Sequence, residues 1–229
     1  GNIMKEYRIA LIVEEIDQSY QSEILNGIAS AAKDFSLNVS AFVSFSASLN
    51  NEKHDIGEFN IFNLPDFNDF DGAILLTNTL AHQPVVANIL SRIKAAGIPA
   101  VSIDNDIPYM YYIGIDNKTA MRSITEHLIN VHGFSEFCYI SGPADNPESA
   151  DRLNAFLQVL NEYDIPFDKG NIYYGDFRSP SGRDAIDFFI ENGIKMPQAI
   201  ICANDVMASS AINRLTEEGY NVPKDIAVT

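Results

Sequence analysis

Short apolar runs alternate along the chain with longer segments that have a helical period. Residues 7–13 (YRIALIV) form a nearly continuous apolar run, as expected of a strand that is covered on both faces. Residues 22–35 then place apolar side chains three and four positions apart, which predicts an amphipathic helix. The cycle repeats along the whole chain, and repeated strand–helix units are typical of parallel sheets with helices on both faces.

The same criteria assign the remaining elements. The expected later strands are 39–45, 71–77, 100–103, 112–115, 137–141, 171–174, 199–202 and 226–228. The expected later helices are 85–96, 118–131, 150–162, 182–192 and 205–218. Gly97 and Pro99 should end the second helix, and Asn117 is the expected cap of the third. The polar stretch 48–57 predicts a surface loop or a short helix.

The alternation pauses once, in the polar, proline-bearing stretch 105–112. We interpret this pause as a boundary between an N-terminal lobe, residues 1–108, and a C-terminal lobe, residues 109–229. The predicted fold class is α/β, with two doubly wound parallel-sheet lobes and a ligand cleft between them. Such sheets bind ligands outside the carboxyl ends of their strands, so the loops that follow strands are the places to search for function.

Charge and composition exclude several classes of protein. The 229 residues include 15 Lys and Arg against 31 Asp and Glu, a formal net charge of −16, so most of this surface would repel a DNA phosphate backbone. No apolar run is long enough to span a membrane. The first six residues lack the apolar core of a signal peptide, and Gly1 is interpreted as a cloning remnant. Cys138 and Cys202 lie in apolar runs, which predicts buried free thiols and a reducing compartment.

A search for catalytic and metal-binding patterns argues against an enzyme. The chain has no G-x-S-x-G, H-E-x-x-H, P-loop or G-x-G-x-x-G motif. Its four histidines fall far apart among the predicted elements, and its two cysteines cannot form a C-x-x-C clip. We therefore expect no catalytic residue, no metal site and no cofactor, and interpret the chain as a binding protein.

Polar side chains do gather where predicted strands end. In the first lobe the loop after the first strand carries Asp17, Tyr20 and Gln21, and Thr77 ends the strand 71–77. Polar residues and an aromatic ring at the positive end of a helix suit a neutral polar ligand. An ordinary connecting loop is the alternative for residues 14–21.

The second lobe offers three more such loops. Asn146 and Arg152 follow the strand 137–141, and a guanidinium there could donate to ligand oxygens. Phe177 follows the strand 171–174, where its ring could stack on a sugar or a base. Asn204 and Asp205 follow the strand 199–202. A surface salt bridge is the alternative for Arg152, and a helix-capping role is the alternative for Asp205.

Over nearly its whole length the sequence also resembles the lactose-repressor-type transcription regulators, whose effector-binding domain has the type I periplasmic-binding-protein fold. The stretches that carry the resemblance are 70–76 (FDGAILL), 97–104 (GIPAVSID), 139–142 (YISG), 152–156 (RLNAF), 175–177 (GDF), 199–208 (AIICANDVMA) and 222–228 (VPKDIAV). The resemblance implies that Arg152 binds the ligand, that Phe177 stacks on it, and that Asn204 and Asp205 form a ligand-binding pair. Tyr20 and Gln21 would occupy two aromatic positions of the family.

The resemblance further implies a cytoplasmic homodimer whose lobes close around a small, sugar-like effector. The signal would pass to a helix-turn-helix domain that this sequence lacks, so DNA would be bound only through that absent domain. Gln21 departs from the family because it replaces an aromatic residue, which points away from a typical hexose. The sequence also stops at Thr229, where the family continues, so closing strands are expected to be missing. Two alternatives stay open: the same sensor fused to a histidine kinase or a diguanylate cyclase, favoured by segment 59–65 and the net acidity, and an exported solute-binding protein.

Overall fold

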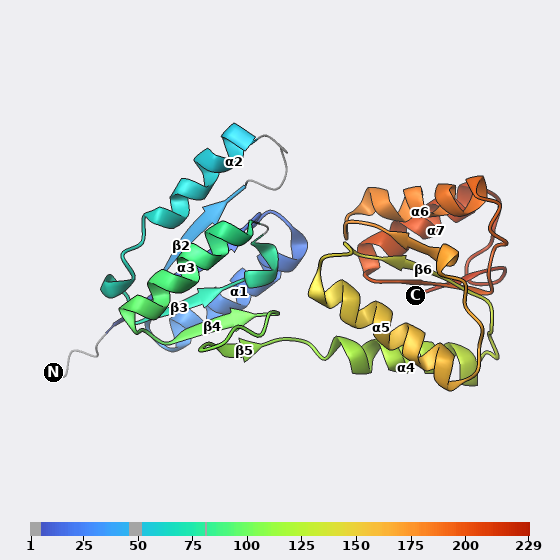
Figure 1. The fold of residues 1–229 in the computed structure, drawn as a ribbon, viewed down its shortest axis with the longest axis horizontal. Helices are drawn as coiled ribbons and strands as arrows, with labels where there is room; N and C mark the ends of the chain where they lie inside the picture. Colours follow the sequence, from blue (N-terminus) through green and yellow to red (C-terminus); the bar gives the residue numbers. More distant parts are fainter. Residues whose placement is uncertain (1–5, 46–51, 81) are drawn as a thin grey trace. The chain divides into compact units, whose positions relative to one another are not determined.

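A computed structural model describes residues 6–45, 52–80 and 82–229, with the backbone alone for residues 52–55. The chain divides into two compact units, Gly1–Ile115 and Asp116–Thr229, here called the first and second lobes (Figure 1). Each lobe is an α/β unit built on its own parallel sheet. The predicted fold class, two doubly wound parallel-sheet lobes, is thereby confirmed.

The first lobe holds a five-stranded sheet within the described residues, in the order β2-β1-β3-β4-β5. All of its pairings are parallel, and β1 runs in register with β2 from Tyr7↔Leu37 to Glu14↔Ser44. The strands are β1 (Tyr7–Glu14), β2 (Leu37–Ser44), β3 (Gly72–Leu75), β4 (Ala100–Ile103) and β5 (Tyr111–Ile113). The helices are α1 (Ser19–Asp34), α2 (Glu52–Phe59), α3 (Gln83–Ala96) and the 3-10 turns η2 (Asn60–Asn63), η3 (Phe67–Asp69) and η4 (Thr77–Thr79).

Both faces of the first sheet are buried, which explains why β1 is almost entirely apolar. Ala10 and Ile12 pack with Ile89 of α3 on one face, while Leu11 and Val13 pack with α1 on the other. Successive side chains of a strand point to opposite faces, so a strand covered on both sides loses the polar alternation of a half-exposed one.

Helix α3 illustrates how local sequence sets the ends of an element. Pro84 lies in its first turn, where the missing N–H costs no hydrogen bond. Gly97 follows the last helical residue with φ +68°, and its N–H donates to the carbonyl of Ile93 at 3.1 Å. The predicted glycine end of this helix is confirmed, because a left-handed backbone position favours glycine.

The second lobe holds a four-stranded parallel sheet in the described chain, in the order β7-β6-β8-β9. Its strands are β6 (Phe137–Ser141), β7 (Ile172–Tyr174), β8 (Ala199–Cys202) and β9 (Ala227–Val228). Its helices are α4 (Asn117–Asn130), α5 (Pro147–Glu162), α6 (Ser179–Glu191), α7 (Asp205–Glu217) and the 3-10 turn η5 (Lys169–Asn171).

The second sheet is also covered on both faces. Cys138 and Ile140 pack with α6 and α7, whereas Phe137 and Tyr139 pack with α4 and α5. Cys138 and Cys202 are free and buried, and burial raises the pKa of each thiol to about 12. Both cysteines therefore stay protonated near neutral pH and behave as small apolar side chains of the core.

The structure corrects the placement of one strand. The sequence analysis puts a strand at 112–115 at the start of the second lobe, but β5 pairs in parallel with β4 of the first lobe, with Val101↔Tyr111 in register. The Asp104 N–H donates to the carbonyl of Ile113 at 2.8 Å, so residues 104–110 turn back within the first lobe. The boundary between the two compact units consequently falls after Ile115, whereas the sequence analysis expected it after residue 108.

Helix starts also differ from those expected. Asn117 is the first residue of α4 rather than its cap, and Asp116 caps the helix by accepting from the Thr119 N–H at 3.0 Å. Helices α5 and α6 begin three residues earlier than expected, each with a proline in the first turn. In the stretch 48–57, residues 52–57 belong to α2, whereas residues 48–51 lie outside the described part of the chain, as does Gly1.

Candidate functional site

Three of the expected ligand-binding residues come together at the carboxyl edge of the second sheet. Arg152 of α5 donates from Nε to Asn117 Oδ1 at 2.9 Å and from Nη1 to the Ala203 carbonyl at 2.5 Å. Its Cζ lies 5.9 Å from the centre of the Phe177 ring. These bonds use two of the five N–H donors of a guanidinium, and no ion-pair partner of Arg152 is found among residues 6–45, 52–80 and 82–229. The surface salt bridge considered for Arg152 is therefore not the arrangement observed there.

Phe177 is held in place by the loop that carries it. Its backbone has φ +66°, and the turn is fixed by Asp176, whose Oδ1 accepts from the Arg178 N–H at 2.9 Å and from Ser181 Oγ at 2.5 Å. The ring lies directly over Gly142, because a Cβ built on that glycine would stand 2.2 Å from Phe177 Cζ. Glycine at position 142 is what allows the ring to approach the loop that follows β6.

Asn204 joins the Phe177 loop to α7. Its Nδ2 donates to the Phe177 carbonyl at 2.8 Å, and its Oδ1 accepts from the Met207 N–H at 3.0 Å, which caps the helix. Asp205 is exposed in the first turn of α7. The cap considered for Asp205 is thus supplied by Asn204, and the Asp205 carboxylate stays at the surface of the same edge.

Asn146 begins α5 on the Arg152 loop. Its Oδ1 accepts from the Ser149 N–H at 3.0 Å, and Ser149 in turn lies 3.0 Å from Ser141 Oγ at the end of β6. Asn146 therefore fixes the start of the helix that carries Arg152, which is a role in positioning the site.

The first lobe presents a second polar cluster at the carboxyl edge of its own sheet. The Tyr20 hydroxyl donates to Asp104 Oδ2, and Asn78 Nδ2 donates to the same oxygen at 3.0 Å. Asn78 Oδ1 is buried and has no hydrogen-bond partner within the described residues. Asp17 is exposed on the loop that leads into α1. This edge therefore offers the Tyr20 ring and the exposed Asp17 carboxylate to a ligand, while Asn78 Oδ1 is a buried acceptor of the same cluster.

The other two candidates of the first lobe form bonds inside it. Gln21 is buried and its Nε2 lies 3.4 Å from the Glu14 carbonyl. Thr77 is also buried, 2.7 Å from Ser102 Oγ and 2.8 Å from the Ile103 carbonyl. Their bonds join the ends of neighbouring elements and so shape the edge on which Tyr20 and Asn78 lie.

The sequence analysis did not select three residues that belong to these clusters, namely Asn78, Asp104 and Asn117. Asn78 and Asp104 directly follow Thr77 and Ile103 near the ends of β3 and β4, so the rule that selected the other loops could have found them. Asn117 gave no such signal, because it contacts Arg152 only after α4 and α5 have packed together.

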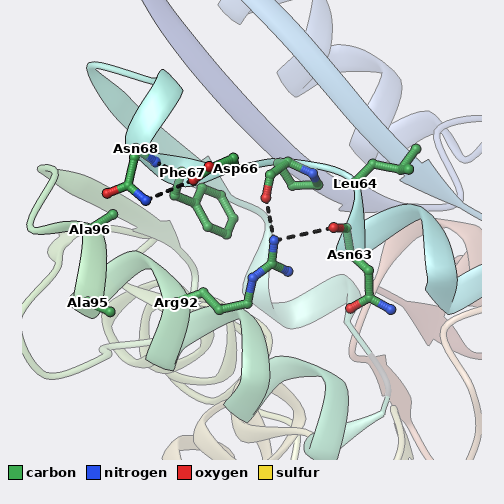
Figure 2. Close-up of a pocket in the computed structure, with 9 residues that line it drawn as sticks. Asn63, Leu64, Asp66, Phe67, Asn68, Arg92, Ala95 and Ala96 are labelled. Atoms are coloured by element: carbon green, nitrogen blue, oxygen red, sulfur yellow. Dashed lines mark hydrogen bonds between the residues drawn. The ribbon is translucent and has the colours of Figure 1, made fainter.

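The first lobe also contains a cavity that none of the residues of its polar cluster lines. It has a volume of about 390 Å³ and is lined by residues 63–68 and by Arg92, Ala95 and Ala96 of α3. Figure 2 shows the Arg92 guanidinium turned toward the loop, where it donates to the carbonyls of Asn63 at 3.5 Å and of Pro65. Arg92 also donates to the Phe62 carbonyl at 2.6 Å. Its Cζ also lies 5.1 Å from the centre of the Phe67 ring. Arg92 thus holds this loop against α3, and none of the expected ligand-binding residues lines the cavity.

Tyr139 is a buried titratable residue near the charge of Arg152. Tyr139 lies in β6 with its hydroxyl buried and without a hydrogen-bond partner in the described chain. Burial raises the pKa of Tyr139, and the nearby charge of Arg152 only partly offsets this, so the phenol stays neutral.

Among the described residues no group of three or more His, Cys, Asp or Glu side chains could hold a metal ion, and no helix is long and apolar enough to cross a membrane.

Nearly the whole chain matches one known protein family. The family described as "Periplasmic binding protein domain" matches residues 9–229. The chain belongs to this family. Its relatives are regulators of the lactose-repressor type, which confirms the resemblance seen in the sequence.

Two curated relatives illustrate the extent of the match. Catabolite control protein A of Priestia megaterium is 24% identical over 225 residues, which are 98% of this chain and 64% of the relative. The HTH-type transcriptional repressor PurR of Aliivibrio fischeri is 35% identical over 163 residues, which are 69% of this chain and 46% of the relative. The periplasmic-binding-protein chain therefore spans about half to two thirds of the length of these relatives.

Solved structures agree on the fold. The lac repressor dimer bound to operator and the anti-inducer ONPF has a TM-score of 0.78 and 21% identity, with 99% of this chain and 74% of that chain covered. The complex of the regulator CelR with cellobiose has a TM-score of 0.79 and 24% identity, with 96% and 66% covered. The two-lobed α/β architecture is thus common to this chain and to known regulators.

Proposed function

We propose that this chain is the effector-sensing domain of a lactose-repressor-type transcription regulator, and that it has no catalytic activity. The observation that supports this most directly is the cluster of Arg152, Phe177 and Asn204 at the carboxyl edge of the second sheet. The residues lie where doubly wound sheets bind ligands. They provide a ring face, amide groups and a guanidinium with unused donors, but no acid, base and nucleophile set.

The effector is a carbohydrate or a related small molecule with a polar ring. Phe177 stacks on its apolar face, and Arg152 donates to its oxygens. Asp205 accepts from its hydroxyl or N–H groups. In the first lobe, we propose the exposed Asp17 and the Tyr20 ring as further ligand-binding residues. Gln21, Thr77 and Asn146 are proposed as supports of these ligand-binding residues because their hydrogen bonds lie within their own lobes.

The proposed output is DNA binding by a helix-turn-helix domain outside this chain. The curated relatives include proteins named HTH-type transcriptional repressors and regulators, which favours this output over a kinase, a cyclase or an exported solute-binding protein. A net charge of −16 opposes direct binding of DNA phosphates by this domain. We further propose a cytoplasmic homodimer, because the lac repressor of similar fold is a dimer bound to its operator.

The site is tested by comparing two arginine substitutions. Arg152→Lys keeps the charge but loses the forked geometry of a guanidinium, so the affinity for an effector should fall at least about tenfold, the equivalent of about 1.4 kcal/mol. Arg183→Lys is the matched control, because Arg183 is exposed on α6 and pairs with Glu217. Titration calorimetry with the same effector should show no change for the control. Equal affinities of wild type and Arg152→Lys would remove Arg152 from the site.

A further inference from the structure

The end of helix α4 brings two histidines side by side. His127 is in the last turn of the helix, and His132 follows two residues after the final helical residue, Asn130. Their Nε2 atoms are 3.2 Å apart, and their ring centres are 5.0 Å apart with planes at 75°. The sequence analysis placed the four histidines far apart among the predicted elements, so this contact corrects it for His127 and His132. The pairing arises from the turn that follows the helix.

The main chain and a neighbouring ring fix this turn. Gly133 has φ +68°, and its N–H donates to the Ile129 carbonyl at 3.0 Å, while the Phe134 N–H donates to Leu128 at 3.1 Å. The His132 ring stacks on Phe134 with centres 5.4 Å apart and planes at 26°. Phe134 itself packs against the buried core of the lobe. The two imidazoles are thus held together before any ligand arrives.

The separation of the two nitrogens suits a metal ion. Zinc binds imidazole nitrogen at about 2.0–2.1 Å in tetrahedral geometry, which places two such nitrogens roughly 3.3–3.4 Å apart. The observed 3.2 Å needs only a slight adjustment. Both histidines are exposed, so water can fill the remaining positions. The carboxyl end of a helix also favours a cation.

We propose that His127 and His132 form a surface site for a divalent transition-metal ion of the class that prefers imidazole, with Zn²⁺ as the probe. Without metal, one Nε2–H donates to the other Nε2. When the metal binds, that imidazole loses the Nε2 proton to solvent and takes one up at Nδ1, so both Nε2 lone pairs reach the ion and the net proton count is unchanged. The site lies in the turn before β6, at the edge of the sheet opposite the Arg152 cluster, and is independent of effector binding.

Two features of the chain keep the test specific. The thiols of Cys138 and Cys202, which would otherwise compete for zinc, are buried and have pKa values raised to about 12, so they remain protonated. His82 provides a matched control, since its ring contacts that of Phe59 in the first lobe, with centres 5.0 Å apart and planes tilted by 44°, and it has no part in the pair.

The experiment is calorimetric titration of the tag-free chain with zinc chloride. Wild type should bind one equivalent, and His127→Gln and His132→Gln should each weaken this binding at least about tenfold, because a single imidazole cannot chelate. His82→Gln should bind as wild type does. Both histidines of the pair are exposed, so circular dichroism should show that the variants stay folded. Absence of one-to-one binding by wild type, or equal affinity in His127→Gln, would overturn the proposal.

Discussion

The ring of Phe177 can lie over position 142 only because Gly142 has no side chain. A substitution of this single residue therefore tests whether the position of the ring matters for binding. A Cβ at position 142 would stand 2.2 Å from Phe177 Cζ, so Gly142→Ala must displace the ring. We expect a loss of about 1–3 kcal/mol in the free energy of unfolding and at least a tenfold loss of effector affinity. Urea denaturation and calorimetry measure the two quantities.

Gly27→Ala is the matched control for this substitution. Gly27 lies in α1, and a Cβ there would meet nothing within 4 Å. Alanine should therefore leave effector affinity unchanged and raise stability by up to about 1 kcal/mol, because it favours the helix. Full effector affinity in Gly142→Ala would show that the position of the Phe177 ring does not matter for binding.

At the scale of single residues, the sequence could indicate the right loops but not the partners of each side chain. Arg152, Phe177 and Asn204 were selected because they follow strands, and the structure does bring them together. The bond from Arg152 to Asn117 joins positions 35 residues apart, so it depends on how α4 and α5 pack. The role of Asn204 as a cap likewise follows from its backbone conformation.

At the scale of elements, substitutions of two capping residues test whether the Phe177 loop controls effector binding. Asn204 both caps α7 and bonds the Phe177 carbonyl, whereas Asp66 caps the 3-10 turn η3 of the first lobe. Asn204→Ala should cost about 1–2 kcal/mol of stability and also weaken effector binding. Asp66→Ala should lower the urea midpoint and leave effector affinity intact. Similar losses of affinity in both variants would mean that general destabilisation, not the Phe177 loop, controls binding.

The Asp116 cap also has a defined dependence on pH. The hydrogen bond from the Thr119 N–H lowers the pKa of Asp116 below its ordinary value of 3.8. A carboxyl with a lowered pKa in the folded state stabilises the protein above its ordinary pKa, and this stabilisation is lost as the pH falls through the lowered value. The difference in urea midpoint between wild type and Asp116→Ala should therefore be present at neutral pH and shrink below pH 3.8.

Element boundaries show where pattern reasoning failed and why. Strands 100–103, 137–141 and 199–202 were predicted with the bounds observed, since buried strands form short apolar runs that end sharply. Strand β5 was assigned to the wrong lobe, because residues 104–110 connect two parallel strands without a helix. The starts of α5 and α6 were placed too late, since their first turns hold Pro147 and Pro180 before the apolar period begins.

At the scale of the whole molecule, both lobes follow one plan. Each has a parallel sheet with apolar side chains on both faces and polar side chains at the carboxyl edge. The repeating strand–helix pattern was enough to predict this plan. The cleft expected between the lobes stays a prediction, as does the class of the effector. The sequence pattern indicates which polar residues lie at the edge of each sheet, but it does not specify how those residues are arranged around a ligand.

The central claim, that the domain senses a small molecule with a polar ring, is tested most directly by a thermal-shift screen of the purified chain against sugars, sugar phosphates, nucleobases and amino acids. A ligand present at one hundred times its dissociation constant adds about 2.7 kcal/mol of stability, which should raise the melting midpoint by roughly 5–10 °C for a chain of this size. We predict such a shift for one class of sugar or related ring compound. A cooperative melt that none of these compounds moves would contradict the account.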